Sequence, residues 1–312
     1  MTSQSSTAFA PASIGNVGVG FDVLGLAIAG AGDRVTVSRS DNAGIAITSI
    51  RTSDGEELTD LSRDADKNTA SIAAAALWQA QGGEGGLTID IEKGVPLQSG
   101  MGSSAASAVA GVVATNALLD VPLPTEALLD YAIEGEAFAS GGRHADNVAP
   151  SLLGGLVLCP PGLDAVRLPT PDTVASVLVH PELRVNTAES RAGLSATVTR
   201  EQWIRQQGLL AGFVTATFSG DLSLMRRSLK DLIIEPQRAP SVSCFESVSR
   251  AAIEAGAIGC SLSGSGPSIF ALIENEQAER LASAMVDACE AQGIDCQSWI
   301  SPLSSPGAAL ED

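Results

Sequence analysis

Hydrophobic and polar residues alternate over several short stretches of the chain, and this period of two predicts β-strands. The alternation is clear at both ends of residues 6–40 and breaks at Gly15, Gly18 and Gly20, which predicts short strands around a glycine-rich turn. Residues 257–273 have the pattern of two strands joined by a second glycine turn. Further strands are predicted at residues 45–50, 86–97 and 174–181, and an edge strand at 295–304.

Longer stretches have the hydrophobic spacing of helices. The first helix is predicted to begin at Asn68 or Thr69 and to end before Gly82 and Gly83. Other helices are predicted at residues 103–119, 124–140, 200–220, 221–233, 244–256 and 275–293. Because strands and helices follow one another in irregular order, with antiparallel strand pairs expected, the pattern predicts an α+β fold in two layers. The pair Pro160 and Pro161 marks the predicted boundary between domains at residues 1–161 and 162–312.

The composition is that of a globular chain, since 45% of the 312 residues are hydrophobic and 17% are charged. The N-terminal residues have no basic start and no apolar run typical of a signal peptide, and no window reaches the ~18 consecutive apolar residues of a membrane span. We therefore expect a cytoplasmic protein. The five cysteines are odd in number and include no C-x-x-C pair, which predicts reduced thiols and no zinc site.

Acidic residues outnumber basic residues by 36 to 18, which gives a net charge of −18. This charge argues against nucleic acids and anionic membranes as partners. The acidic run at residues 53–66 is interpreted as a solvated loop. An anionic substrate would need local positive charge, a helix N-terminus or a divalent cation, so the positions of the few arginines are informative.

The stretch "PLQSGMGSS", residues 96–104, places glycines and hydroxyl residues between a predicted strand and an alanine-rich helix. Two interpretations remain open at this point. The turn is either a helix start that packs closely, or a loop whose backbone N–H groups bind phosphate. A P-loop would carry lysine after its last glycine, where this chain has Ser103; the nearest lysine, Lys93, precedes the turn.

Three other segments hold candidate site residues, each with a structural alternative. Glu136 lies on a predicted helix and either binds a metal or faces solvent, and His144, Asp146 and Asn147 follow it in a polar cluster. Asn16 and Asp22 flank the first glycine turn, where they could serve only as turn residues. The turn "SGSGPS", residues 263–268, could be a plain hairpin.

Taken together, the three glycine motifs resemble the GHMP kinase superfamily, and within it the homoserine kinase family. The resemblance spans nearly the whole chain and includes "TAESRAGL" and "EPQRAP", which are typical of homoserine kinases. It implies an N-terminal ribosomal-S5-domain-2-like layer, a C-terminal ferredoxin-like layer and an active site in the cleft between them. Homodimers are common in the family, so the resemblance allows a homodimer.

The resemblance also implies transfer of the ATP γ-phosphate to the side-chain hydroxyl of L-homoserine, a step toward threonine. Ser104 and Glu136 would be the Mg²⁺ ligands, and Asn68 would contact the nucleotide. Asn16 and Asp22 would bind the substrate ammonium, Arg191 and Arg238 its carboxylate, and His144, Asn147 and Thr187 would lie near the hydroxyl. We favour Asn147 orienting that hydroxyl over Asp146 acting as a base. The loop around the triphosphate would comprise Pro96, Leu97, Gln98, Ser99, Gly100, Met101, Gly102, Ser103, Ser104, Ala105 and Ala106.

Two other functions remain open on the sequence. The chain could be a GHMP kinase for another small alcohol, such as L-threonine or mevalonate, although mevalonate has no ammonium for Asp22 to bind. It could also be a non-catalytic nucleotide-binding regulator on the same fold. Such a regulator would be expected to lack Ser104, Glu136 or one of the two arginines, and this chain has all of them.

Overall fold

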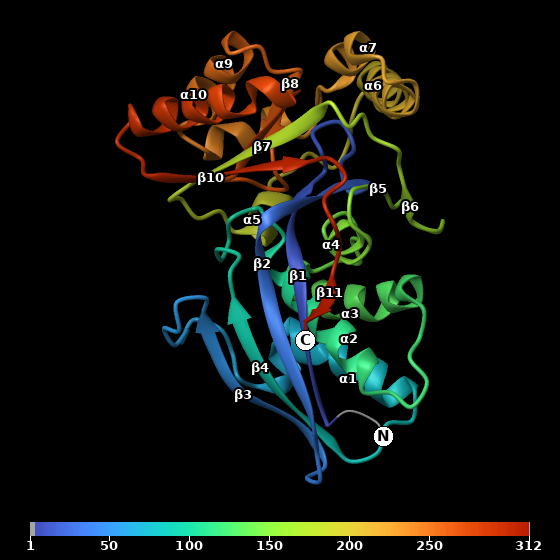
Figure 1. The fold of residues 1–312 in the computed structure, drawn as a ribbon. Helices are drawn as coiled ribbons and strands as arrows, with labels where there is room; N and C mark the ends of the chain where they lie inside the picture. Colours follow the sequence, from blue (N-terminus) through green and yellow to red (C-terminus); the bar gives the residue numbers. More distant parts are fainter. Residues whose placement is uncertain (1–3, 312) are drawn as a thin grey trace.

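The computed structural model describes residues 4–311 and contains two β-sheets, one in each lobe (Figure 1). The first sheet has seven strands in the order β11-β1-β2-β4-β3, with β5 paired to β2 and β6 paired to β5. All of these pairs are antiparallel except β3 with β4. Its strands are β1 (Ser5–Gly15), β2 (Leu24–Ser40), β3 (Gly44–Thr52), β4 (Gly86–Lys93), β5 (Leu156–Leu158), β6 (Val166–Arg167) and β11 (Ala309–Glu311).

The second sheet is antiparallel and has four strands in the order β10-β7-β9-β8. It contains β7 (Val174–Pro181), β8 (Gly259–Leu262), β9 (Ile269–Glu274) and β10 (Cys296–Pro302). The predicted edge strand at residues 295–304 is confirmed as β10, which pairs only with β7 in this sheet.

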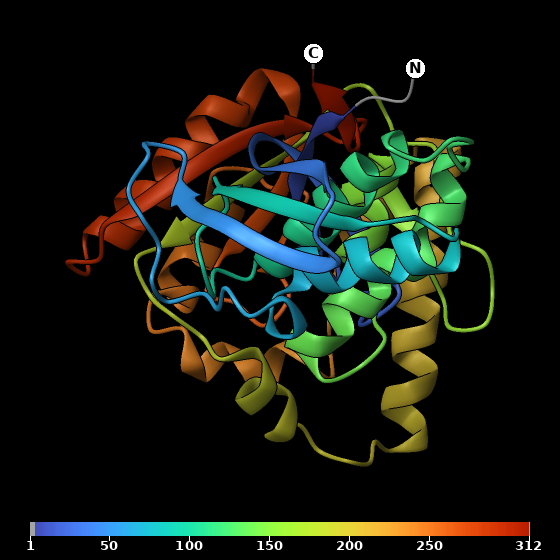
Figure 2. The ribbon, with the colours of Figure 1, turned by 90° about the horizontal axis from the view of Figure 1, so that it is seen from below.

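Helices α1 to α4 gather on one side of the first sheet, as two perpendicular views show (Figures 1 and 2). The α2 helix is central because eight of its small or apolar side chains are fully enclosed, which lets neighbouring helices approach closely. The helices of this layer are α1 (Thr69–Ala80), α2 (Ser103–Ala117), α3 (Leu129–Ser140) and α4 (Val148–Leu153). The 3₁₀ turns Ala65–Lys67 and Thr125–Leu128 precede α1 and α3.

Helices α9 and α10 pack against each other and against the second sheet, where their apolar faces form a separate core. The remaining helices connect the lobes or project from them. The helices of this half are α5 (Thr187–Ala192), α6 (Arg200–Ser219), α7 (Leu222–Ser228), α8 (Glu235–Arg238), α9 (Phe245–Glu254) and α10 (Ala278–Glu290), with 3₁₀ turns at Ala239–Ser241 and Asn275–Gln277.

The predicted α+β fold is confirmed, but some predicted element boundaries differ from those in the structure. The helix predicted at residues 221–233 ends at Ser228, because Leu229 turns out of helical geometry and is buried. The domain boundary at residues 161 and 162 remains a prediction. Two segments beyond it, β6 and β11, nevertheless pair in the first sheet. None of the described helices combines the length and the hydropathy that a membrane span requires.

Candidate active site

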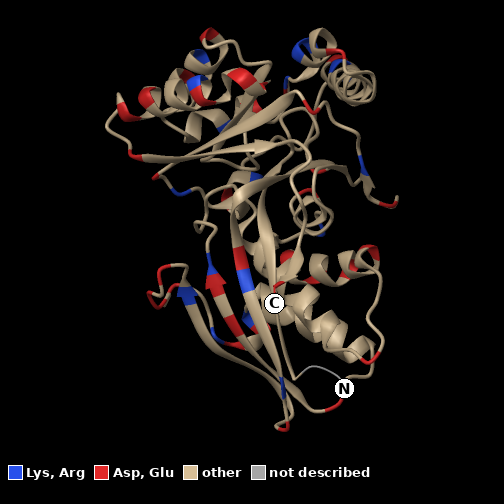
Figure 3. Cartoon of the chain, viewed as in Figure 1, with Lys and Arg blue, Asp and Glu red and all other residues tan. Residues whose placement is uncertain are grey.

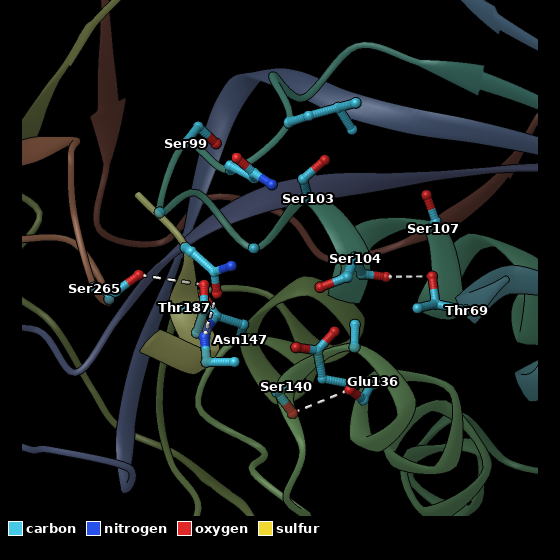
Figure 4. Close-up of a pocket in the computed structure, with 18 of the residues that line it drawn as sticks. Thr69, Ser99, Ser103, Ser104, Ser107, Glu136, Ser140, Asn147, Thr187 and Ser265 are labelled. Carbon is cyan, nitrogen blue, oxygen red and sulfur yellow. Dashed lines mark hydrogen bonds between the residues drawn. The ribbon is translucent and has the colours of Figure 1, made fainter. Parts of the chain in front are cut away.

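A cavity of about 580 Å³ lies where the two lobes meet, a volume typical of small-molecule sites. Its walls come from the β1–β2 turn, the segment between β3 and α1, the end of β4 with the loop and first turns of α2, the segment from α3 to α4, the segment from Arg184 through α5, Arg238 of α8 and the turn between β8 and β9. Figure 4 shows Ser104 and Glu136 on one side of this space, with Thr187 and Ser265 on the other. The fold therefore brings together residues that are more than a hundred positions apart.

The loop between β4 and α2 is shaped by glycines that no other residue could replace without a clash. Gly100 has φ of 76°, and a Cβ there would lie 2.6 Å from the carbonyl oxygens of Ser263 and Gly266. Gly102 has φ of 67°, and a Cβ there would lie 2.4 Å from Ser13 Oγ. The "SGSGPS" turn thus packs directly on this loop, and Ser263 Oγ donates a hydrogen bond of 2.7 Å to the Gly100 carbonyl.

The N-terminus of α2 faces the cavity without a side-chain cap. Its N-cap residue is Gly102, which offers no side-chain acceptor to the first N–H groups of this 15-residue helix. Ser103 does not replace the cap, because its hydroxyl donates to the Val95 carbonyl at 3.0 Å. The free N–H groups and the positive end of the helix dipole make this position suited to an anion.

Glu136 on α3 is the buried carboxyl of this site, with only 8% of the residue exposed. Its Oε2 has no hydrogen-bond partner among the described residues. Burial raises the pKa of Glu136 to about 7, while Ser104, the next contributor, acts in the opposite direction. A buried carboxylate oxygen without a partner beside a serine hydroxyl is a donor set that fits a hard cation. Residues 4–311 contain no cluster of three or more His, Cys, Asp or Glu side chains that could hold a metal, so any cation would need further ligands.

Asp22 and Arg191 form a bidentate ion pair on the opposite side of the cavity, with Nη–Oδ distances of 2.7 and 2.9 Å. His144 Nδ1 lies 3.4 Å from Asp22 Oδ2. Burial lowers the pKa of His144, and the Asp22 charge opposes that shift. Three of the six predicted substrate-binding residues, Asp22, Arg191 and His144, therefore lie together, and Asp22 and Arg191 already neutralise each other.

Arg238 on α8 is buried, and its Nη1 donates a hydrogen bond of 2.9 Å to the Gly264 carbonyl. Burial lowers its pKa, and the neighbouring Arg191 charge adds to this effect. Phe21 lies between the two arginines, with ring-to-guanidinium distances of 5.3 Å to Arg191 and 5.2 Å to Arg238. The Nε atoms of both arginines are buried without an acceptor in the described chain, which leaves two donors for a carboxylate.

The β1–β2 turn is held in a left-handed backbone conformation at Asn16 and Asp22, with φ of 68° and 61°. Such conformations are rare outside glycine and are concentrated at functional sites. The Asn16 side chain accepts the Asp22 N–H at 3.0 Å and donates to the Gly264 carbonyl at 3.0 Å. Asn16 therefore orients Asp22 while its own amide is engaged within the protein.

Asp146 and Asn147 precede α4 and have different surroundings. Asp146 is buried, and its Oδ2 accepts the backbone N–H of Asn16 at 3.2 Å. Burial, and then the Asp22 charge, raise the pKa of Asp146 to about 7. Asn147 Oδ1 accepts a hydrogen bond of 3.0 Å from Ser13 Oγ, which leaves its Nδ2 available to the cavity. Thr187 Oγ1 lies 3.3 Å from Ser265 Oγ, and both residues are on the side of the cavity opposite Glu136.

The residues predicted to contact the nucleotide differ in how they lie relative to the cavity. Asn68 lines the cavity, but its Oδ1 caps α1 at Ala70 N and its Nδ2 donates to the Ser62 carbonyl. Leu97, Gln98, Ser99, Gly100, Gly102, Ser103 and Ser104 line the cavity. The side chains of Met101, Ala105 and Ala106 are instead buried in the cores behind it, and Pro96 also lies outside the cavity wall. Helix α2 is therefore closely packed behind the cavity, while its N-terminus faces the cavity.

The structure also shows where Arg143, which directly precedes His144, and the acidic loop at residues 53–66 lie. Arg143 is exposed, 3.8 Å from Asp130 and 4.0 Å from Glu134, and lies outside the cavity wall. The acidic loop reaches the cavity through Asp60, which lies 3.8 Å from Arg184 of the other lobe. Sequence reasoning missed Phe21, although it stands between Asn16 and Asp22, and a lone aromatic residue in a turn gave no signal for it.

Comparisons with known proteins cover the whole chain. The family model for the GHMP kinases N terminal domain matches residues 68–155, and that for GHMP kinases C terminal matches residues 211–291. The curated homoserine kinase of Xanthomonas campestris pv. campestris (strain B100) is 42% identical over 309 residues, 98% of this chain and 94% of that protein. That of Chlorobium phaeobacteroides (strain BS1) is 43% identical over 319 residues, 97% of this chain and 98% of that protein.

A solved structure gives the same likeness in three dimensions. The crystal structure of homoserine kinase from Cytophaga hutchinsonii ATCC 33406 has a TM-score of 0.94 and 42% identity, and the match covers 99% of this chain and 98% of that one. The likeness extends over both lobes.

Proposed function

Because this chain belongs to the homoserine kinase family of the GHMP kinases, we propose that its cavity transfers the γ-phosphoryl group of ATP to the side-chain hydroxyl of L-homoserine. The homoserine oxygen forms a bond to the γ-phosphorus, and the bond between that phosphorus and the β,γ-bridging oxygen breaks. The products are O-phospho-L-homoserine and ADP, and the hydroxyl proton leaves with the phosphoryl oxygens.

The amino-acid end of the substrate fits the side of the cavity that carries Asp22 and the two arginines. The Asp22 carboxylate would accept hydrogen bonds from the ammonium, and Arg191 and Arg238 would donate to the carboxylate through their unpaired Nε atoms. In a protein with a net charge of −18, two neighbouring guanidinium groups give the local positive charge that a carboxylate needs. Figure 3 shows acidic residues distributed over both lobes.

The triphosphate fits the other side of the cavity, at the uncapped N-terminus of α2. Backbone N–H groups of the loop and of the first helical turn would donate to its oxygens, as the fixed left-handed glycines point them inward. This arrangement holds the phosphate without a lysine contact of the P-loop kind. Ser104 Oγ lies at the end of this turn and faces Glu136.

Ser104 and Glu136 would hold a Mg²⁺ ion, which would also need phosphate oxygens and water as ligands. When bound, the ion neutralises charge on the transferring phosphoryl group. The unpaired and desolvated oxygen of Glu136 supports this position, since a cation there would remove the cost of burying the carboxylate.

The reacting hydroxyl would lie near Asn147, His144 and Thr187. Asn147 lines the cavity and its oxygen is held by Ser13, so its Nδ2 would be the group that holds the hydroxyl oxygen in line with the phosphorus. Phosphoryl transfer relies mainly on alignment and on charge stabilisation, and it proceeds without a strong base. Asp146 is turned toward the backbone of Asn16 and is not needed as a proton acceptor in this scheme.

The observation that carries the proposal is the pairing of an uncapped helix start with an Asp–Arg–Arg cluster across one cavity. Product identification tests it directly. ³¹P NMR of a mixture of the protein, MgATP and L-homoserine should show a phosphomonoester resonance that grows as ADP appears. ADP formation that does not depend on homoserine would contradict the proposed transfer.

A further inference from the structure

Three polar side chains lie buried beneath the loop between β4 and α2, and the reaction scheme does not use them. Lys93 is the last residue of β4, Asp33 lies on β2, and Ser107 lies one turn into α2. The side chains of Lys93 and Asp33 are 4% and 0% exposed and form an ion pair. A buried charged side chain is stable only where partner groups provide opposite charge and hydrogen bonds. The contacts of Lys93 and Asp33 therefore show which parts of the chain they hold in place.

Asp33 holds the beginning of the loop. Its Oδ1 accepts the backbone N–H groups of Gly94 and Val95, both at 3.0 Å. Its Oδ2 accepts a hydrogen bond of 2.7 Å from Ser107 Oγ and another from the Lys93 ammonium. One carboxylate on β2 therefore joins the start of the loop to helix α2.

Lys93 holds the end of the loop. Its Nζ donates to the Ser103 carbonyl at 2.7 Å, to Ser107 Oγ at 2.9 Å and to Asp33. An ammonium has three N–H donors, so these contacts use all of them. Although Lys93 borders the cavity, it has no donor left for a phosphate oxygen. Its contacts reach Ser103 and stop one residue short of Ser104.

We propose that Lys93 and Asp33 are positioning residues that clamp the two ends of the phosphate loop and so set the N-terminus of α2 for the triphosphate. The inference rests on the proposed function in that the ligand is MgATP. A lysine in this chain thus serves the phosphate site from behind the loop instead of touching the phosphate. Its charge also acts on Glu136, where it opposes the effect of burial on the pKa of that carboxyl.

The main test combines Lys93→Met with Asp33→Asn. Either change alone would leave a buried charge without its partner, whereas the double variant removes both charges and retains similar shapes. We expect the double variant to fold, with circular dichroism like that of the wild type. Its calorimetric Kd for MgATP and its KM for ATP should both rise about tenfold or more because the loop is less well preorganised. The KM for homoserine should stay within about twofold, since that site lies across the cavity.

Lys230→Met is the matched control, because it removes one lysine charge from an exposed position outside the cavity wall. It should leave the affinity for MgATP unchanged. A folded double variant that binds MgATP as tightly as the wild type would overturn the proposal. Equal losses for ATP and homoserine would also overturn it, because they would indicate a merely structural role.

If the double variant does not fold, Ser107→Ala tests the positioning role instead. It removes one hydroxyl that contacts both Asp33 and Lys93, and we expect an increase of about threefold or more in the Kd for MgATP. Ser176→Ala, a buried hydroxyl in β7 that bonds only to the Ser301 carbonyl, is its control and should have no effect. MgATP binding is measured without homoserine, so a protein that binds ATP but does not phosphorylate homoserine would contradict only the proposed function. Unchanged ATP affinity in Ser107→Ala would contradict only the positioning role.

Discussion

Asp22 and Arg191 bind each other on one side of the cavity through two hydrogen bonds of 2.7 and 2.9 Å, and both residues line that cavity. A zwitterionic amino acid carries both of these charges, so it can bind Asp22 through its ammonium and Arg191 through its carboxylate. The ion pair keeps two charged side chains ordered before the substrate arrives. The substrate then adds contacts to groups that need little rearrangement.

Arg238 differs from Arg191 because no ion pair of Arg238 is found among residues 4–311. Its guanidinium is therefore the freer partner for the homoserine carboxylate. Arg238→Ala should raise the KM for homoserine by about 10- to 100-fold, the loss expected for hydrogen bonds to a charged group, and should leave the KM for ATP near the wild-type value. Steady-state kinetics with each substrate varied in turn measures both constants.

The control for this change is Arg143→Ala, which removes an exposed arginine whose ion pairs within residues 4–311 are those with Asp130 and Glu134. We expect both KM values of that variant to match the wild type. If Arg238→Ala raised the two KM values equally, Arg238 would not be a homoserine ligand.

Glu136→Ala should lower kcat by roughly 10² or more, by analogy with the loss of one preorganised charge-stabilising group. The metal-free variant should be at least as stable as the wild type, because the change removes a desolvated carboxyl of which one oxygen has no partner among the described residues. Thermal unfolding and single-turnover kinetics give the two values. Glu134→Ala, on the exposed side of the same helix, should change neither, and an undiminished kcat in folded Glu136→Ala would remove Glu136 from the site.

The pH dependence of Mg²⁺ binding follows from the pKa of Glu136, which is about 7 without a cation. A proton and a cation compete for the same carboxylate, so acid weakens cation binding and binding releases a proton. From about pH 8 to about pH 6 the ionised fraction of such a group falls roughly tenfold, and the affinity for Mg²⁺ in the presence of ATP should fall by about the same factor. Calorimetry in buffers of different ionisation enthalpy would detect the released proton. In Glu136→Gln this contribution should disappear, and if proton release persisted there, another group would be responsible.

Asn147 and Asp146 are adjacent but should differ in their effects on catalysis. Asn147→Ala removes the amide that we propose orients the hydroxyl, and it should lower kcat by about tenfold or more. Asp146→Asn retains an oxygen that can accept the Asn16 N–H, so kcat should change by less than about fivefold. The pH profile of kcat in Asp146→Asn is the decisive measurement, since the loss of an entire limb of the profile would identify Asp146 as the base.

The sequence predicted most of the regular elements because their periodicity is local. The strand at residues 174–181 coincides with β7, and the helix expected at 103–119 with α2 to within two residues. The short helices α4, α5 and α8 were not predicted, since a helix of four to six residues carries too little periodicity. Their formation depends on tertiary contacts.

The candidate site could be predicted from the sequence where its residues stand in glycine motifs. Residue types alone could not indicate that Asp33 contacts Lys93, since the two are 60 positions apart and each stands beside another charged residue, Arg34 or Glu92. The pairing of Asp22 with Arg191, 169 positions apart, was also not foreseen, although both residues were assigned to the substrate. The first contact arises when β2 pairs with β4, and the second only when helix α5 packs beside the β1–β2 turn.

The substrate preference tests the central claim most directly. A coupled assay of ADP release should compare kcat/KM for L-homoserine, L-threonine, L-serine and mevalonate under saturating MgATP. The Asp22 and arginine cluster favours an amino acid over mevalonate, and the hydroxyl of homoserine lies one carbon further from Cα than those of threonine and serine. We predict that L-homoserine has the highest kcat/KM of the four. A higher value for L-threonine or mevalonate would contradict the assignment, and no turnover of any of them would instead favour a nucleotide-binding protein without kinase activity.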